Sequence, residues 1–345
     1  MKPEPSKTTD KTSDELHGVK MNTTRPRKPK HLAATVTIAF MAASLLAGCG
    51  TSGGASSAPA KPQIGVLIKD TTIPFFGRQI KGYEEAAAKY GMDVTIYNGK
   101  SDNATQVGLI QQLITKKVDM MMVTPGDPQA INGALKQAAN AHIPVVAVNT
   151  EPNDKTNILS FIGANDVEYG HALGKLVAAA TGGKGKIAVV RGKLGDPADT
   201  LRRKGLEEEL QNTPGLQIVA EQASNWDSAK ALNVTQDFLN KYPKGELDAV
   251  VDVGPDTVSA AKYAHDNNRS EIKFIMGDFP SNVKQGIKDG YIYGTVNQDP
   301  YEQSAKAMEL ADKYFKGDKS AFPATQYLPL PLVTKENVDN YPAAW

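Results

Sequence analysis

Short apolar runs alternate with longer amphipathic stretches along the chain from residue 63 onward. The run at 64–68 has the continuous apolar character of a buried strand. Apolar residues at helical spacing follow it up to Tyr90, and Gly91 is typical of a helix end. This alternation predicts strands at 64–68, 94–97, 120–123 and 145–148, and helices at 76–90, 104–114 and 130–141.

The same cycle restarts in the second half of the chain. Strands are predicted at 186–190, 216–220, 249–252, 274–276 and 293–296, and helices at 167–180, 200–211, 229–240, 257–266, 282–288 and 302–316. Repeated strand–helix units predict parallel sheets covered by helices on both faces. The two successive sets therefore predict an α/β protein with two doubly wound parallel-sheet lobes.

The first 48 residues have the features of an export signal. A basic cluster at 25–31 precedes an apolar run at 32–46, which is shorter than the roughly 20 residues of a membrane-spanning helix. The sequence Leu-Ala-Gly-Cys at 46–49 then resembles the lipobox of bacterial lipoproteins, in which the cysteine becomes the lipidated first residue. Cys49 is the only cysteine of the chain, so no internal disulfide can form. We therefore predict a leader at 1–48 and lipidation of Cys49, with a transmembrane anchor as the alternative.

Two further features concern the ends of this leader. Residues 1–20 add nothing that a signal needs, and Met21 is interpreted as the true start. Residues 50–62 are rich in Gly, Ser, Ala and Pro, so 49–62 is predicted to be a flexible tether.

The charge balance argues against nucleic acid as a partner. The chain has 39 basic and 38 acidic residues, of which the leader holds eight and four. The remainder has 31 against 34, a net charge of −3. Binding to a phosphate backbone calls for a basic surface, which this composition does not provide.

The residues that follow the predicted strands have a common chemistry. Ligands of open α/β sheets bind beyond the carboxyl ends of the strands. Planar hydrogen-bonding groups suit neighbouring hydroxyls, and the C–H faces of a sugar ring pack on aromatic rings. The sequence therefore predicts a polyhydroxylated ligand. The candidates at these positions are Phe75, Phe76, Asn149, Arg191, Arg202, Trp226, Asp256, Asp278 and Gln298.

Three stretches carry a resemblance to a known family. Residues 64–76 read IGVLIKDTTIPFF, 119–125 read DMMMVTP and 143–149 read IPVVAVN. On these the chain resembles a type I periplasmic binding protein of the ribose-binding family, over nearly all of 63–335. The resemblance implies that a three-stranded hinge joins the lobes, with crossings near 164/165, 298/299 and 329/330. The N-terminal lobe would comprise 63–164 and 299–329, and the C-terminal lobe 165–298 and 330–345.

The resemblance also implies roles for single residues. Phe75 and Phe76 match the aromatic contacts of the first lobe, and Trp226 matches that of the second. Arg202, Asp278 and Gln298 match polar ligand contacts. The alternatives are core packing for the three aromatic residues, a solvated cationic face for Arg202 and a helix cap for Asp278.

Three positions depart from the ribose-binding pattern. Asn149 stands where the pattern has an Asp, Thr150 where it has an Arg, and Gly254 where it has an Asn. Asp256 is the candidate to replace that amide, with a helix cap as its alternative. These departures predict that the ligand is not ribose but another monosaccharide, a sugar acid, another sugar derivative or a polyol.

The resemblance implies a non-catalytic function with no cofactor and no metal. It implies a monomeric solute-binding lipoprotein of an ABC importer, held outside the cytoplasmic membrane or in the periplasm, that delivers ligand to a permease with a cytoplasmic ATPase. The alternative is a sugar or signal receptor that feeds chemotaxis or quorum sensing.

Two other classes of protein are weighed against this interpretation. An enzyme is disfavoured because no G-x-G-x-x-G follows the first strand, and no G-x-x-x-x-G-K-[ST] or G-x-S-x-G occurs. A sugar-responsive repressor with the same core needs a helix-turn-helix ahead of it, where this sequence has an export signal and a spacer.

Overall fold

The computed structural model describes residues 60–318 and 322–345. The predicted leader, Cys49 and most of the predicted tether lie outside these residues. Across 60–318 and 322–345, every helix is too short or too polar to cross a bilayer.

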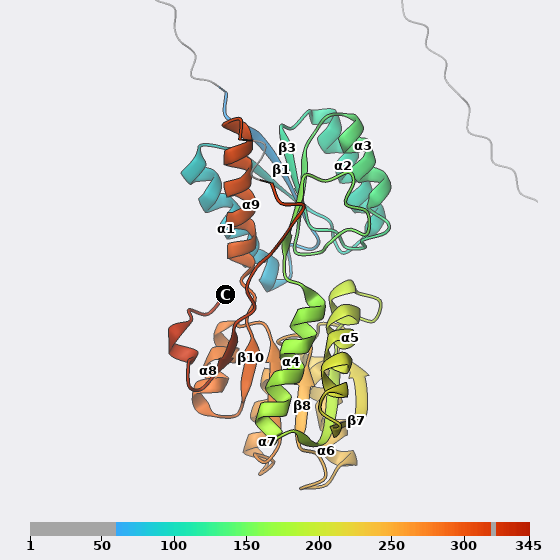
Figure 1. Cartoon of the computed structure of the whole chain (residues 1–345), viewed down its shortest axis with the longest axis vertical. Coiled ribbons are helices and arrows are strands. Elements are labelled where there is room, and N and C mark those ends of the chain that lie inside the picture. Colours follow the sequence, from blue (N-terminus) through green and yellow to red (C-terminus); the bar gives the residue numbers. More distant parts are fainter. Residues whose placement is uncertain (1–59, 319–321) are drawn as a thin grey trace, which may run out of the picture. The chain divides into compact units, whose positions relative to one another are not determined.

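The first sheet has six strands, and every pairing within it is parallel. Helices α1 and α9 cover one of its faces, and α2 and α3 cover the other (Figure 1). The strands, in spatial order, are β11 (Thr325–Tyr327), β5 (Ser160–Gly163), β4 (Val145–Val148), β3 (Met120–Val123), β1 (Gln63–Ile68) and β2 (Asp93–Asn98). The helices are α1 (Pro74–Tyr90), α2 (Asn103–Lys116), α3 (Asn132–Asn140) and α9 (Pro300–Phe315).

The second sheet also has six strands and is parallel except for β12, which pairs antiparallel with β10. Helices α4 and α5 cover one face, and α6, α7 and α8 cover the other. The strands, in spatial order, are β12 (Leu332–Thr334), β10 (Gly294–Val296), β9 (Lys273–Gly277), β8 (Ala249–Asp252), β6 (Lys184–Arg191) and β7 (Gly215–Ala223). The helices are α4 (Asp166–Thr181), α5 (Pro197–Gln211), α6 (Ser228–Lys241), α7 (Val258–Asp266) and α8 (Ser281–Asp289), with a 3₁₀ turn η1 at Val338–Asn340.

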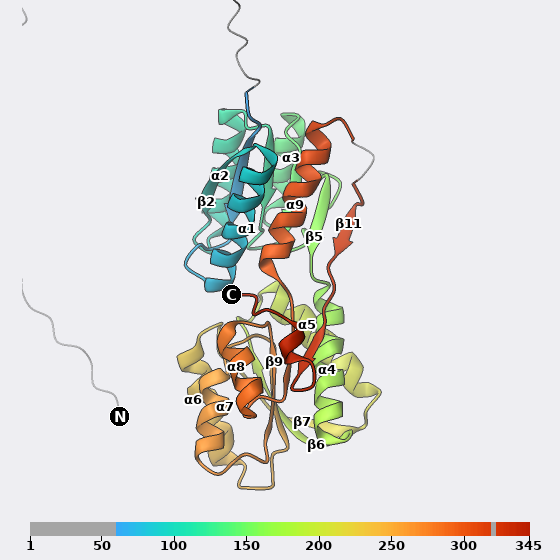
Figure 2. The ribbon, with the colours of Figure 1, turned by 90° about the vertical axis from the view of Figure 1, so that its left-hand side faces the viewer.

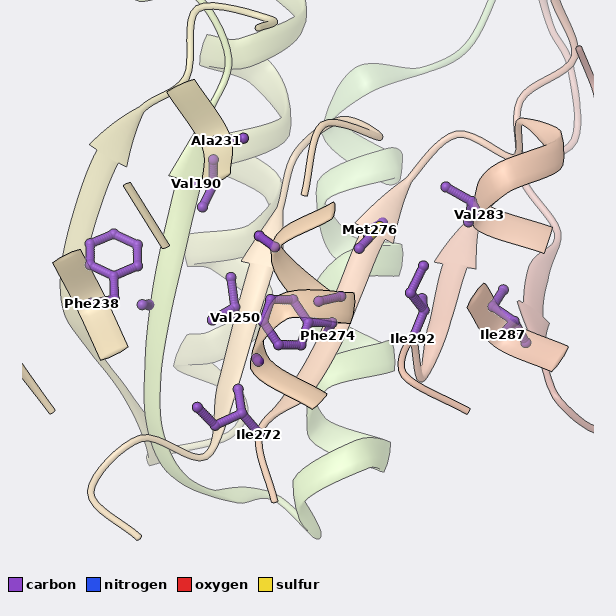
Figure 3. Packing of buried hydrophobic residues seen from close by; sticks show 14 of the residues in the cluster. Val190, Ala231, Phe238, Val250, Ile272, Phe274, Met276, Val283, Ile287 and Ile292 are labelled. Carbon is purple, nitrogen blue, oxygen red and sulfur yellow. The ribbon is translucent and has the colours of Figure 1, made fainter. Parts of the chain in front are cut away.

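Each sheet is buried on both faces, because successive side chains of a strand point to opposite sides. In β8, Val250 packs under α6 and α7, whereas Val251 packs under α4 and α5. Figure 3 shows the core under α6 and α7, where Phe274 of β9 lies next to Val250 of β8. A strand that is buried on both faces has apolar residues at successive positions, and these continuous apolar runs are what allowed the strands to be predicted from the sequence.

The predicted α/β class with two parallel-sheet lobes is confirmed. The short strands β5, β11 and β12 were not predicted as strands. Both β11 and β12 have only three residues, which are too few to show the pattern of a strand.

Helix α1 begins at Pro74 rather than at residue 76, and two other helices also begin two or three residues earlier than predicted. Helix α5 begins at Pro197 rather than at residue 200, and α9 begins at Pro300 rather than at residue 302. An aspartate caps each of these two helices immediately before the proline, which is tolerated at the first helical position.

The chain passes between the two sheets three times (Figure 2). It leaves the first sheet after Gly163, returns to it through the start of α9 at Pro300, and leaves again between Tyr327 and Leu332. The predicted lobe boundaries are compatible with these passages and stay predictions.

Close backbone contact joins α4 to α5. A Cβ added at Gly170 would lie 2.1 Å from the carbonyl oxygen of Arg202, and one added at Gly205 would lie 2.0 Å from that of Val167. Only glycine at both positions allows this approach. Since Arg202 lies on α5, this contact sets the position of a predicted site residue.

We expect Gly170→Ala to destabilise the protein by about 1–3 kcal/mol, because the new methyl group overpacks the contact between α4 and α5. Gly108 is a suitable control, since it is an exposed glycine of α2 with open space around its Cβ position. Gly108→Ala should stabilise the protein by roughly 0.5–1 kcal/mol through better helix propensity. Urea unfolding followed by circular dichroism measures both, and equal effects of the two substitutions would contradict the proposed packing constraint.

Candidate functional site

A cavity of about 520 Å³ lies between the carboxyl-end loops of the two sheets. Eight of the nine candidate ligand contacts line it, and Arg191 is the exception. The lining residues are Lys69, Ile73, Pro74, Phe75, Phe76, Asn149, Thr150, Asp196, Ala198, Arg202, Trp226, Ser228, Pro255, Asp256, Asp278, Pro280, Ser281, Asn282, Gln298 and Trp345.

One aromatic wall comes from the start of α1. The rings of Phe75 and Phe76 meet edge to face, with centroids 5.2 Å apart. Phe75 also meets the ring of Trp345 edge to face, at 5.3 Å. Phe76 is 6% exposed and packs in the core under α1 and α9 as well. It therefore serves the core and the cavity wall at once.

Trp226 forms a second aromatic wall, from the loop before α6. Its backbone has a φ of 62°, an uncommon conformation for a bulky residue. The indole lies against two glycines: a Cβ at Gly192 would meet it at 2.1 Å and one at Gly254 at 2.8 Å. An asparagine at position 254, which the family pattern leads one to expect, would occupy the space that the indole fills.

Arg202 is 5% exposed and held by three groups. Its Nε donates to Asp166 Oδ1 at 2.8 Å, and its Nη1 donates to the carbonyl oxygen of Val253 at 2.8 Å. The guanidinium carbon lies 3.8 Å from the ring centroid of Tyr169. The alternative of a solvated cationic face does not apply, because this side chain is buried.

Asp278 is buried among neutral donors. Its Oδ1 accepts hydrogen bonds from Tyr169 Oη at 2.9 Å and from Gln298 Nε2 at 2.8 Å. Burial raises the pKa of Asp278, and the charge of Arg202 opposes part of that rise. Pro280 occupies the N-cap position of α8, which has no side-chain cap, so Asp278 does not cap that helix.

Asp256 is 8% exposed and has a sparse set of partners. Ser224 Oγ donates to its Oδ2 at 3.3 Å. Burial raises the pKa of Asp256 to about 6, and the charges of Asp278 and Asp227 act in the same direction. The N-cap of α7 is Thr257, without a side-chain cap bond, so the alternative role as a helix cap does not apply to Asp256.

Asn149 and Gln298 are linked through a glutamine of α9. Gln303 Nε2 donates to Gln298 Oε1 at 3.2 Å, and Asn149 Nδ2 donates to Gln303 Oε1 at 3.3 Å. Thr150 lines the cavity beside Asn149. Polar groups from the two sheets thus belong to one hydrogen-bonded set.

Several lining residues were not singled out from the sequence, among them Lys69, Asp196 and Trp345. Lys69 follows β1 directly, and its Nζ lies 2.5 Å from Oδ2 of Asp196, the N-cap of α5. Trp345 is held beside α8, where its carbonyl oxygen accepts from Ser281 N at 2.8 Å. Only Lys69 had a usable signal, its place at the end of a strand.

Arg191, by contrast, was expected at the site and does not line the cavity. Its Nε donates to Asp199 Oδ1 at 2.8 Å, and its Nη1 donates to Glu221 Oε1 at 2.6 Å. Asp199 is fully buried, so this guanidinium serves as the partner of an internal carboxylate.

The sequence of this chain is similar to those of a known protein family. Residues 64–319 match the family described as periplasmic binding protein domain. The ribose import binding protein of Salmonella typhimurium is 26% identical over 291 residues, which cover 84% of this chain and 94% of that protein. The xylitol-binding protein of Mycolicibacterium smegmatis is 25% identical over 298 residues, which cover 85% and 83%.

A solved structure supports the same assignment. The ABC transporter periplasmic solute-binding protein of Actinobacillus succinogenes, solved with bound D-allose, superposes with a TM-score of 0.75 at 27% identity. The match covers 81% of this chain and all of that one. The chain therefore belongs to the periplasmic binding protein family, whose members bind solutes and do not catalyse reactions.

Proposed function

We propose that the protein is the extracytoplasmic solute-binding lipoprotein of an ABC importer. It captures a monosaccharide, sugar derivative or polyol in the cavity between the sheets and delivers it to a permease with a cytoplasmic ATPase. The observation that carries this proposal is the composition of the cavity wall, which combines aromatic rings with a guanidinium, carboxylates and amides.

The wall suits a hydroxylated ring or chain for a physical reason. Each ligand hydroxyl is both a donor and an acceptor, and the wall offers both kinds of partner. Asp256 and Asp278 accept, Arg202 donates, and Asn149 and Gln298 do both. Apolar C–H faces of the ligand would pack on the rings of Phe75, Phe76, Trp226 and Trp345.

Ligand binding is coupled to the contact between the two lobes. Lys69, after β1 of the first sheet, pairs with Asp196, which caps α5 beside the second sheet. The ligand would touch both sides of the cavity at once and so favour the conformation in which they are close. A permease can then distinguish loaded from empty receptor by this conformation.

Import is preferred to signalling because of the relatives. The Salmonella typhimurium protein is named as an import binding protein, and the Actinobacillus succinogenes protein is described as part of an ABC transporter. A receptor that feeds chemotaxis or quorum sensing would use the same closed conformation, and no contact in the described part of the chain favours it.

The proposal is tested by a thermal-shift screen over pentoses, hexoses, polyols and sugar acids. A ligand that binds only the folded protein increases the free energy of unfolding and so raises the melting temperature. At a ligand concentration of a hundred times Kd, the added stability is about 2.7 kcal/mol. The chain has two tryptophans, and both line the cavity, so intrinsic fluorescence should change with each stabilising ligand. If no compound of the four classes shifts the melting temperature, the proposed function is wrong.

We expect Trp345→Ala to weaken ligand binding by about 1–2 kcal/mol, because it removes one aromatic wall, and Trp226→Ala to weaken it by on the order of 2 kcal/mol or more. Calorimetry with a ligand from the screen measures both. Tyr263→Ala is the matched control, since Tyr263 is an aromatic residue of α7 that is 38% exposed and does not line the cavity. Unchanged affinity in Trp345→Ala would remove this residue from the site.

The lipid anchor rests on the sequence at Cys49. We expect Cys49→Ala to move the protein from the membrane fraction to the soluble extracytoplasmic fraction and to abolish labelling with radioactive palmitate, since the thiol that carries the lipid is gone. Ser52→Ala, in the predicted tether, should leave the protein in the membrane fraction. Membrane retention of Cys49→Ala would favour the transmembrane alternative.

A further inference from the structure

The cavity wall has more carboxylates than cationic side chains. Lys69 and Arg202 are the cations of the wall, and both are already engaged. Lys69 Nζ lies 2.5 Å from Asp196, and Arg202 Nε donates to Asp166 at 2.8 Å. Arg202 also lowers the pKa of Asp278 through its charge, but neither Lys69 nor Arg202 forms an ion pair with Asp256.

Two carboxylates of the wall, Asp256 and Asp278, form no ion pair with any cation of residues 60–318 and 322–345. Asp278 takes its hydrogen bonds from the neutral groups of Tyr169 and Gln298, and Asp256 takes one from Ser224 at 3.3 Å. Both aspartates are less than a tenth exposed. Buried charges are normally paired, because an unpaired charge loses its hydration without compensation.

Asp256 is the less satisfied of the two aspartates. Asp278 accepts hydrogen bonds of 2.9 and 2.8 Å, and the charge of Arg202 stabilises its ionised form. Asp256 accepts a single hydrogen bond of 3.3 Å among the described residues. Burial raises the pKa of Asp256 to about 6, which reflects how poorly its charge is compensated.

The indole of Trp226 stands next to this carboxylate. A Cβ at Gly254 would lie 2.8 Å from the indole and 3.7 Å from Asp256 Oδ2, so the two side chains border the same spot. An ammonium group bound in the cavity beside Asp256 would meet an acceptor-only carboxylate with the indole of Trp226 close to it. Charge-assisted hydrogen bonds and cation–π contacts both favour such a group.

We propose that the ligand is an amino-substituted sugar or polyol, whose ammonium group pairs with Asp256 beside Trp226. This inference rests on the proposed function and narrows its ligand class. The remaining hydroxyls meet the amides and Arg202, as a neutral polyol would. Anionic sugar derivatives are disfavoured, since the wall already carries more carboxylates than cations.

The experiment compares matched ligands by calorimetry with the full chain. Two sets compare the amino, neutral and acid forms of one skeleton: D-glucosamine, D-glucose and D-glucuronate, and glucamine, sorbitol and gluconate. A third set compares only an amino and a neutral form, an aminodeoxyinositol and myo-inositol. In at least one set the amino form should bind about tenfold or more tightly than the neutral form, as expected of a charge-assisted hydrogen bond. The acid forms should bind least.

Two variants assign that preference to a residue. Asp256→Asn keeps the shape of the side chain and removes its charge, so the preference for the amino form should fall to about twofold or less while the neutral form still binds. Asp237→Asn removes an equal charge from an exposed position of α6 and should leave the preference unchanged.

Each outcome decides between the proposals. Tighter binding of the neutral or acid forms would overturn the amino-ligand inference and leave the proposed sugar-binding function standing. A preference for amino forms that survives in Asp256→Asn would also overturn it, because another group would then hold the ammonium. Failure of every compound to bind, together with a negative thermal-shift screen, would overturn the proposed function itself.

Discussion

The carboxylate of Asp278 can only accept hydrogen bonds when it is ionised, and this constraint orients a buried chain of amides. Gln298 must turn its NH₂ toward Asp278, so its Oε1 accepts from Gln303 at 3.2 Å. Gln303 Oε1 then accepts from Gln79 at 3.3 Å, and Gln79 Oε1 accepts from Thr124 at 3.3 Å. One charge beside the second sheet thus sets the direction of hydrogen bonds as far as Thr124, the residue that follows β3 of the first sheet.

This direction gives a reason for the asparagine at position 149. Gln303 Oε1 accepts from Asn149 Nδ2 at 3.3 Å, so the residue at 149 has to be a donor. The aspartate of the ribose-binding pattern would place a carboxylate oxygen against a carbonyl oxygen there. The departures at Asn149 and Gly254 are therefore consequences of neighbours, Gln303 in one case and Trp226 in the other, rather than isolated changes.

The sequence predicts those parts of the fold that depend on local pattern. Buried parallel strands such as β3 are continuous apolar runs, and the positions after them face a common edge, so eight of the nine predicted residues lie around one cavity. Arg191 also follows a strand, but it does not line the cavity, because its guanidinium pairs with the buried carboxylate of Asp199. Trp345 could not be predicted in this way, since its place depends on the path of the chain after β12 and on its bond to Ser281.

Asp196 contacts three groups that lie far apart in the sequence or in the fold: the start of α5, Lys69 and Trp226. As the N-cap of α5 it accepts from Ala198 N at 3.1 Å, and a carboxylate is favoured at that end of a helix. It also pairs with Lys69 of the other lobe and accepts from Trp226 Nε1 at 3.3 Å. A ligand that packs on the indole of Trp226 therefore contacts a side chain that is hydrogen-bonded to Asp196, and Asp196 in turn pairs with Lys69 of the other lobe. Because the ion pair is largely shielded from water, with side-chain exposures of 16% and 7%, its contribution depends on the lobes staying close. Occupancy of the aromatic wall and contact between the lobes are in this way coupled through one residue.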